Sequence, residues 1–131
     1  MENLSSNFKT KELFIGVEDF YQTLKSGNID PAWYISPLLI AGLEKLRAEI
    51  SAPIIINSGF RTPEHNFAVG GAKNSMHLYG IAVDIYSPDV HISDLYDSAK
   101  GIEIFKGFGK AKTFLHLDVR NSLDNVEWTY D

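Results

Sequence analysis

The sequence contains no cysteine among its 131 residues. Disulfide bonds, thiolate-bound zinc and thiol nucleophiles are therefore all excluded. Any metal ion that this chain binds must be held by histidine, aspartate or glutamate, which are the remaining common ligands. The absence does not identify a compartment, because a chain without thiols suits both oxidising and reducing surroundings.

Positive charge is also scarce. The chain has 12 Lys and Arg residues against 17 Asp and Glu residues, a formal net charge of -5, and no extended basic cluster. Proteins that bind nucleic acids usually carry a basic face, so we expect no nucleic-acid partner.

Long apolar runs are missing as well. The apolar stretches are far shorter than the roughly 20 residues needed to cross a bilayer, so we expect no membrane insertion. Residues 1–7 lack a basic stretch followed by an apolar one, which predicts synthesis in the cytoplasm without a signal peptide. No repeat or low-complexity run divides the chain, and we expect a single domain over residues 1–131 that is a monomer.

Apolar spacing and turn residues predict helices ahead of a small sheet. The predicted helices cover residues 17–25, 37–50 and 94–100, with a short turn or helix over 63–69, and the predicted strands cover residues 54–56, 81–86 and 113–119. Ser36 is expected to cap the second helix ahead of Pro37, and Ser93 or Asp94 to cap the last one. This order predicts an α+β domain with a small, mainly antiparallel sheet against which the N-terminal helices pack.

Two histidines and an aspartate form the most informative group in the sequence. Residues 75–84 read SMHLYGIAVD and contain His77 and Asp84, while His116 opens a His-Leu-Asp triplet. Two imidazoles and one carboxylate are a typical ligand set of catalytic zinc, with a fourth position open for water. Each of the three residues taken alone is more simply explained by a structural role. An unpaired Asp84 carboxylate on the otherwise apolar strand would, however, cost free energy, which favours a shared metal site. The same set describes the non-haem iron triad, which further requires a distal histidine after Asp118 that the chain lacks.

This pattern resembles a known family. The spacing Ser-x-His-x-x-Gly-x-Ala-x-Asp followed by His-x-Asp is similar to the signature of the zinc D-Ala-D-Ala carboxypeptidases. These are peptidoglycan peptidases related in fold to lysostaphin-type enzymes and to the signalling domain of hedgehog proteins. Residues 57–66 and 69–75 also resemble the family's segment before the first ligand, and the likeness extends over residues 36–128. The resemblance implies a hedgehog-like α+β fold, one zinc ion and a peptidoglycan stem peptide as substrate.

The resemblance also implies residue roles. The implied zinc ligands are His77, Asp84 and His116. Arg61 resembles an arginine that binds a substrate carboxylate or steadies the carbonyl oxygen, and a guanidinium suits either role; the alternative is a surface salt bridge, for example to Glu64. Ser75 resembles a serine that contacts substrate, and its alternative is a hydrogen bond within a turn.

Asp118 lies two positions beyond His116, so both side chains project to the same face of a strand. It could act as general base, or it could hydrogen-bond a ligand histidine, and the sequence favours neither role. His65 is expected to be structural, and His91 to be exposed in a loop.

The chain departs from the family near the last ligand. Many relatives place an acidic residue or a histidine two or three positions before it, where this chain has Thr113 and Phe114. The segment Gly107–Gly109 also lacks the usual following tyrosine.

From the motif and the resemblance together we expect a zinc peptidase that cuts peptidoglycan stem peptides at the cell wall, as a carboxypeptidase or endopeptidase. A phage endolysin released at lysis is one expected origin. The alternative is a zinc-binding module of the cell wall, or one that binds protein, without catalytic activity.

Overall fold

The computed structural model describes residues 3–130, so the predicted domain limits at residues 1 and 131 lie outside the described range. Its elements, with η for a 3-10 helix, are η1 (Thr10–Phe14), α1 (Glu18–Ser26), η2 (Pro31–Tyr34), α2 (Pro37–Ile50), β1 (Ile55–Ser58), α3 (Pro63–Ala68), η3 (Met76–Tyr79), β2 (Ala82–Tyr86), α4 (Ile92–Lys100), β3 (Gly107–Lys110), β4 (Leu115–Asp118) and β5 (Val126–Thr129).

The strands form one sheet in the order β1-β2-β4-β3-β5. Neighbouring strands pair antiparallel except β3 and β5, which are parallel. The predicted α+β class with a small, mainly antiparallel sheet is confirmed.

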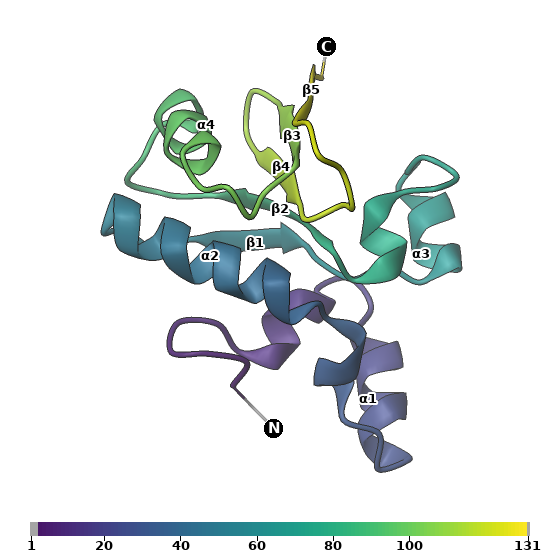
Figure 1. Cartoon of the computed structure of the whole chain (residues 1–131). Helices are drawn as coiled ribbons and strands as arrows, with labels where there is room; N and C mark the ends of the chain where they lie inside the picture. The colour runs from purple at the N-terminus through teal and green to yellow at the C-terminus, as the bar shows by residue number, and fades with distance from the viewer. Residues whose placement is uncertain (1–2, 131) are drawn as a thin grey trace.

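The helices lie unevenly around this sheet (Figure 1). Helix α2 runs alongside β1 and packs against α4, while α1 and η1 gather near the N-terminus. Alternate residues of β2 and β4 enter the core: Val83 and Ile85 are fully buried, as are Leu115 and Leu117. The residues between them, which include the candidate ligands, face the other side of the sheet, as predicted from the strand period.

The helices agree with the prediction within about two residues, with two differences at their starts. Ser36 occupies the N-cap of α2, but its side chain makes no capping hydrogen bond. The expected cap of α4 at Ser93 or Asp94 is wrong, because the first turn begins earlier: the Leu95 amide donates to the His91 carbonyl at 2.9 Å. His91 is therefore the N-cap residue.

Two strands were not predicted from apolar spacing, although the family resemblance places residues 107–111 at a glycine-rich strand. β3 reads Gly-Phe-Gly-Lys, and glycine is depleted in strands. β5 is four residues long and mostly exposed, so it carries no apolar alternation that would indicate a strand. Both strands turn out to build the functional face.

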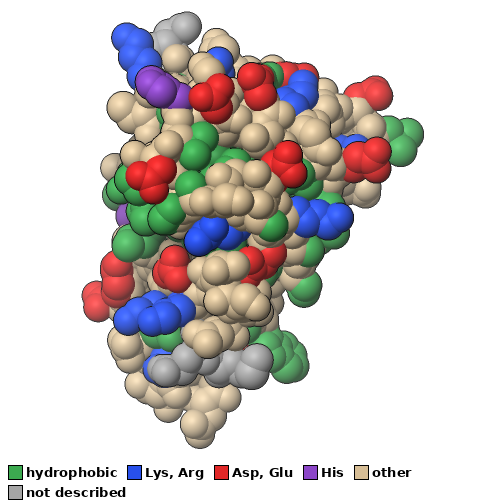
Figure 2. Space-filling model, turned by 90° about the vertical axis from the view of Figure 1, so that its left-hand side faces the viewer, with side chains coloured by type: hydrophobic (Ala, Val, Ile, Leu, Met, Phe, Trp, Pro, Cys, Tyr) green, Lys and Arg blue, Asp and Glu red, His purple; other side chains and the backbone are tan. Residues whose placement is uncertain are grey.

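The surface is consistent with the charge expected from the sequence. Figure 2 shows acidic and basic side chains interspersed on the face drawn, without a broad patch of one sign. Within residues 3–130, the structure contains no helix with the length and apolar character that a membrane span requires.

Candidate metal centre

One row of paired residues crosses the whole sheet. In strand order, the row consists of Ser58, Asp84, His116, Gly109 and Trp128. Residues paired directly across strands project to the same face. The sheet therefore places a carboxylate next to an imidazole, with a strand on either side to hold both.

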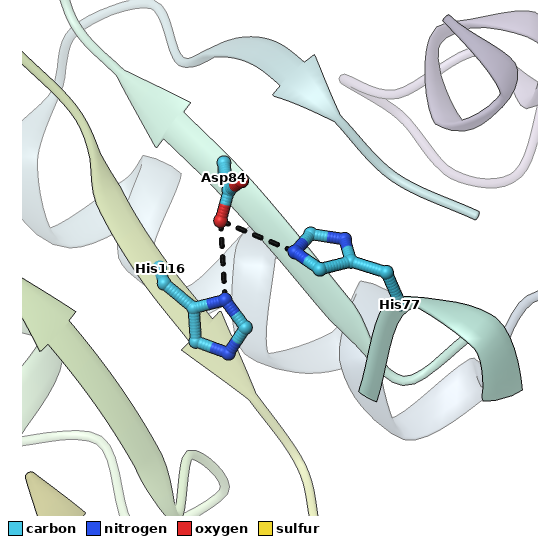
Figure 3. A group of neighbouring side chains, drawn as sticks. All are labelled: His77, Asp84 and His116. Carbon is cyan, nitrogen blue, oxygen red and sulfur yellow. Dashed lines mark hydrogen bonds and ion pairs between the residues drawn. The ribbon is translucent and has the colours of Figure 1, made fainter. Parts of the chain in front are cut away.

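His77 joins this row from outside the sheet. Its Nε2 lies 3.2 Å from Asp84 Oδ1, and His116 Nδ1 lies 3.1 Å from the same oxygen. Figure 3 shows both imidazoles directed at the one carboxylate. One ligand atom from each residue lies within 4.8 Å of the others, and all three residues are buried.

The short helix η3 positions His77. Ser75 is its N-cap, and the Ser75 hydroxyl accepts a hydrogen bond from the His77 amide at 3.2 Å. Gly80 ends the helix at φ 69°, and a Cβ there would lie 1.8 Å from the Tyr34 carbonyl oxygen. Only glycine fits this turn, which returns the chain to β2.

Hydrogen bonds on the sides of the two imidazoles away from Asp84 determine which ring nitrogen carries the proton. His77 Nδ1 lies 2.8 Å from the Gly59 carbonyl oxygen, which can only accept, so Nδ1 carries the proton. His116 Nε2 lies 2.8 Å from Asp118 Oδ2 and is protonated for the same reason. In the neutral imidazoles, the nitrogens that face Asp84 then carry lone pairs. Two lone pairs and a carboxylate oxygen converge on one point, which is an arrangement that a cation stabilises.

The geometry of these donors fits zinc. Zinc–ligand distances of about 2.0–2.2 Å in a tetrahedral site separate ligand atoms by about 3.4 Å. The separations of Asp84 Oδ1 from His77 Nε2 and His116 Nδ1, 3.2 and 3.1 Å, are close to that value. Three protein ligands leave one tetrahedral position for water or substrate.

Asp118 lies behind His116, away from the point of convergence. Its side chain is fully buried and accepts hydrogen bonds from Arg120 Nε at 2.8 Å and Arg120 Nη2 at 2.7 Å. Burial works to raise the pKa of the Asp118 carboxyl, but the bonds from Arg120 and His116 outweigh it and hold that pKa well below its usual range. Asp118 is therefore a permanent carboxylate that fixes the ring of His116.

Burial and hydrogen bonding also oppose each other in their effects on the pKa values of Asp84 and His116. Burial opposes ionisation of Asp84, yet the His116 and His77 rings, which can donate to it when both of their nitrogens carry protons, keep the pKa of its carboxyl well below the ordinary value in the metal-free protein. Burial also works to lower the pKa of His116, and the hydrogen bonds to Asp118 and Asp84 raise it overall. Asp84 is thus an anion at any physiological pH.

Arg61 is held at the opposite end of the row. Its guanidinium donates to Ser58 Oγ at 3.0 Å, to Asn66 Oδ1 at 3.1 Å and to Asp84 Oδ2 at 3.3 Å. The alternative salt bridge to Glu64 is not what the structure shows, since the ion pair of Arg61 is with Asp84.

The three donors open onto a cavity of about 500 Å³. Besides the candidate ligands, its lining residues are Arg61, Val69, Gly70, Gly71, Ala72, Asn74, Ser75, Met76, Phe114, Arg120, Trp128 and Tyr130. Asp84 is the one carboxylate in the lining among residues 3–130. The lining of this described range therefore offers no carboxylate other than this candidate ligand as general base. Burial raises the pKa of the Tyr130 hydroxyl, which keeps that group a proton donor at neutral pH.

Two glycines of β3 make the site possible. A Cβ on Gly109 would lie 2.6 Å from Trp128 Cε2, and a Cβ on Gly107 would lie 2.1 Å from Asp118 Oδ2. Gly109 lets the Trp128 ring reach across β3 to His116, with ring centroids 5.0 Å apart. The Gly-x-Gly spacing, which puts both glycines on one face, was the available signal in the sequence.

Arg120 and Trp128 are the functional candidates that sequence reasoning missed. The Arg120 guanidinium lies 5.3 Å from the centroid of the Trp128 ring, within the range of a cation–π contact. An arginine two positions after Asp118 was visible in the sequence, but Trp128 could not be placed without knowing that β5 pairs with β3.

The remaining histidines stay outside the cluster. His65 is partly buried on α3, where its ring lies against Gly16. His91 is exposed at the start of α4, as expected.

Comparison with known proteins agrees with this geometry. A stretch of 33 residues is 54% identical to the zinc D-Ala-D-Ala carboxypeptidase of Streptomyces albus G, and it covers 25% of this chain but only 13% of that relative. The chain thus spans a minor part of that relative's length. A family model described as Peptidase M15 matches residues 6–118. Since that match covers most of the chain, the resemblance inferred from the motif is confirmed, and the protein belongs to the Peptidase M15 family.

Proposed function

We propose that this protein is a zinc-dependent peptidase that hydrolyses stem peptides of peptidoglycan at the bacterial cell wall. The observation that carries the proposal is the convergence of His77 Nε2, His116 Nδ1 and Asp84 Oδ1 at the floor of an open cavity. The family supports the reaction class, and the name of the Streptomyces relative supports the substrate class.

Each residue of the centre has a distinct part in this proposal. Zinc held by His77, Asp84 and His116 would supply a Lewis acid that activates water and polarises a carbonyl group. Asp118 and the Gly59 carbonyl orient the two imidazoles from behind, which fixes their tautomers. Arg61 lies beside Asp84, where its remaining N–H groups can stabilise negative charge that develops on a carbonyl oxygen. Ser75 lines the same cavity and is a candidate contact for the peptide.

The test is digestion of purified peptidoglycan by the zinc-loaded protein, with products identified by mass spectrometry. Released D-alanine would indicate carboxypeptidase cleavage, and longer peptide fragments would indicate cleavage of an internal bond. We expect His77→Ala to remove both products and bound zinc, because a ligand is lost. His91→Ala is the matched control and should retain both, since His91 is exposed and belongs neither to the cluster nor to the cavity lining.

A second candidate function is a zinc-binding module of the cell wall that lacks turnover. It is favoured by the lining of the cavity, in which Asp84 is the single carboxylate of the described chain. Bound zinc with retention on peptidoglycan, but no new products after prolonged digestion, would establish this second candidate and exclude the first.

A further inference from the structure

We propose that Arg120, which packs against the Trp128 ring, binds the terminal carboxylate of the substrate peptide and is therefore a specificity-determining residue. This inference rests on the proposed function, because it concerns the same cavity. It assigns carboxylate recognition to the β4–β5 side of the cavity, whereas the family resemblance points to Arg61 on the β1 side.

Arg61 and Arg120 differ in which of their N–H groups remain free to bind a ligand. Arg61 places one N–H from each of its three nitrogens on a different protein acceptor. Arg120 uses Nε and Nη2 on a single carboxylate, that of Asp118. The Nη1 edge of Arg120 therefore keeps both N–H groups, and its Nη2 keeps one, for a ligand.

The position of Arg120 presents those free donors to the cavity. Its side chain is 22% exposed, against 12% for Arg61, and it lines the cavity beside the metal cluster. The fork held by Asp118 and the contact with Trp128 fix the plane of the guanidinium before any ligand arrives. A preorganised, planar pair of donors is what bidentate carboxylate recognition requires.

The charge around the cavity favours an anion. Its lining contains two arginines and one aspartate, and the buried Asp118 carboxylate balances the charge of Arg120, so with neutral imidazoles a bound zinc ion would make the cavity positive. The whole chain, by contrast, carries a formal net charge of -5. An anionic group of a substrate is thus attracted to this cavity against the overall charge of the protein.

The spacing favours a carboxylate one residue beyond the bond at the cluster. Two hydrogen bonds link Arg120 to the ring of His116, through Asp118 Oδ2 at 2.7 and 2.8 Å. One extended amino acid spans about 3.5 Å, and metal–oxygen and hydrogen-bond contacts add length at each end. Arg120 lines the same cavity as His77, Asp84 and His116. A peptide whose second-last carbonyl lies at these three residues can direct its terminal carboxylate to Arg120, which predicts carboxypeptidase specificity.

The experiment measures binding, so it does not depend on turnover. The probe is a phosphinate analogue of acetyl-Lys-D-Ala-D-Ala, which cannot be hydrolysed, prepared as the free acid and as the C-terminal amide. We expect zinc-loaded wild-type protein to bind the free acid at least tenfold more tightly than the amide by calorimetry. Arg120→Gln should reduce this ratio to less than twofold, and Arg120→Lys should retain part of it.

Two controls separate recognition from a structural effect. Zinc content is measured for every variant, because Arg120 also holds Asp118; a purely structural loss would weaken both probes equally and leave their ratio unchanged. Arg47→Gln, on α2, removes an arginine elsewhere and should keep the wild-type ratio.

The outcomes also distinguish this inference from the proposed function. A wild-type protein that binds both probes equally, or an Arg120→Gln variant that keeps the wild-type ratio, would overturn the assignment even if peptidoglycan is hydrolysed. Selectivity that depends on Arg120 without hydrolysis would support the assignment and reject the peptidase.

Discussion

Asp118 does not face the metal position, yet it determines the orientation and tautomer of the ligand His116. It is fully buried, bonds His116 Nε2 and receives two donors of Arg120. A carboxylate in this place fixes the tautomer that leaves Nδ1 as a lone pair, and it strengthens that nitrogen as a ligand. The sequence left open whether Asp118 is a base or a partner of histidine, and we propose the second role because of this position.

We predict that Asp118→Asn weakens zinc binding by roughly 10- to 100-fold, which is the usual effect of losing the outer partner of a ligand histidine. The affinity is measured by competition with a chromogenic chelator. Asp124→Asn is the control, because Asp124 is exposed. Unchanged affinity in the Asp118 variant would show that the tautomer is set in some other way.

Gly109 is a second residue whose role depends on what surrounds it. An added methyl group would lie 2.6 Å from Trp128 and 2.8 Å from Tyr130 Cε1. We predict that Gly109→Ala lowers the free energy of unfolding by about 1–3 kcal/mol, as overpacking does, and shifts the fluorescence of Trp128. Gly101→Ala, where the nearest atom is 3.5 Å away, should change neither. If Gly109→Ala were as stable as wild type with unchanged fluorescence, the close packing of Trp128 over β3 would be wrong.

At the scale of elements, the sequence was informative where period and length were clear. α1, α2, β2 and β4 were predicted within about two residues from apolar spacing. β3 and β5 were not, since glycines and exposed residues carry no such period, and their pairing depends on contacts distant in sequence. The ligand triad was predicted from its motif, while the role of β5 in covering His116 could be recognised only in the folded sheet.

The N-terminal segment is attached to α2 by one carboxylate. Glu44 accepts hydrogen bonds from the Asn7 amide at 2.8 Å, from Asn7 Nδ2 at 2.7 Å and from the Ser5 hydroxyl. Burial works to raise the pKa of Glu44, but these bonds outweigh it and lower that pKa from its ordinary value. The ionised form is thus favoured by folding.

A lowered pKa in the folded state gives stability that is present above the ordinary glutamate pKa and is lost as pH falls through the folded value. We predict that Glu44→Gln lowers the melting temperature near pH 7, and that the difference from wild type shrinks below about pH 4, around the ordinary glutamate pKa. Scanning calorimetry from pH 3 to 7 measures this. Glu49→Gln, on the exposed part of the same helix, is the control. A difference that is the same at every pH would show that the contribution of Glu44 is not electrostatic.

For the whole molecule, the centre joins residues from three different elements of the fold. His77 comes from η3, Asp84 from β2 and His116 from β4, so the site exists only when these elements are assembled. A ligand that binds only the native state stabilises it in proportion to the logarithm of its concentration over Kd.

We therefore predict that zinc raises the melting temperature, by an amount equivalent to about 2.7 kcal/mol at a free concentration of 100 times Kd. EDTA should reverse the shift, and magnesium should not reproduce it, because magnesium prefers six oxygen ligands. Differential scanning fluorimetry provides the measurement. A melting temperature that does not respond to one equivalent of zinc would contradict the assignment of the cluster as a metal centre.

The glycines of β3 have a consequence for how this chain tolerates change over evolution. The Gly-x-Gly of β3 and the His-x-Asp of β4 are paired residue for residue, Gly107 with Asp118 and Gly109 with His116. Drift at either glycine is then as restricted as drift at the groups it makes room for, although neither glycine has any chemistry of its own. A side chain at Gly107 would collide with Asp118 and one at Gly109 with Trp128, so we expect a substitution at either glycine to disturb the ligand site as directly as a substitution of a ligand.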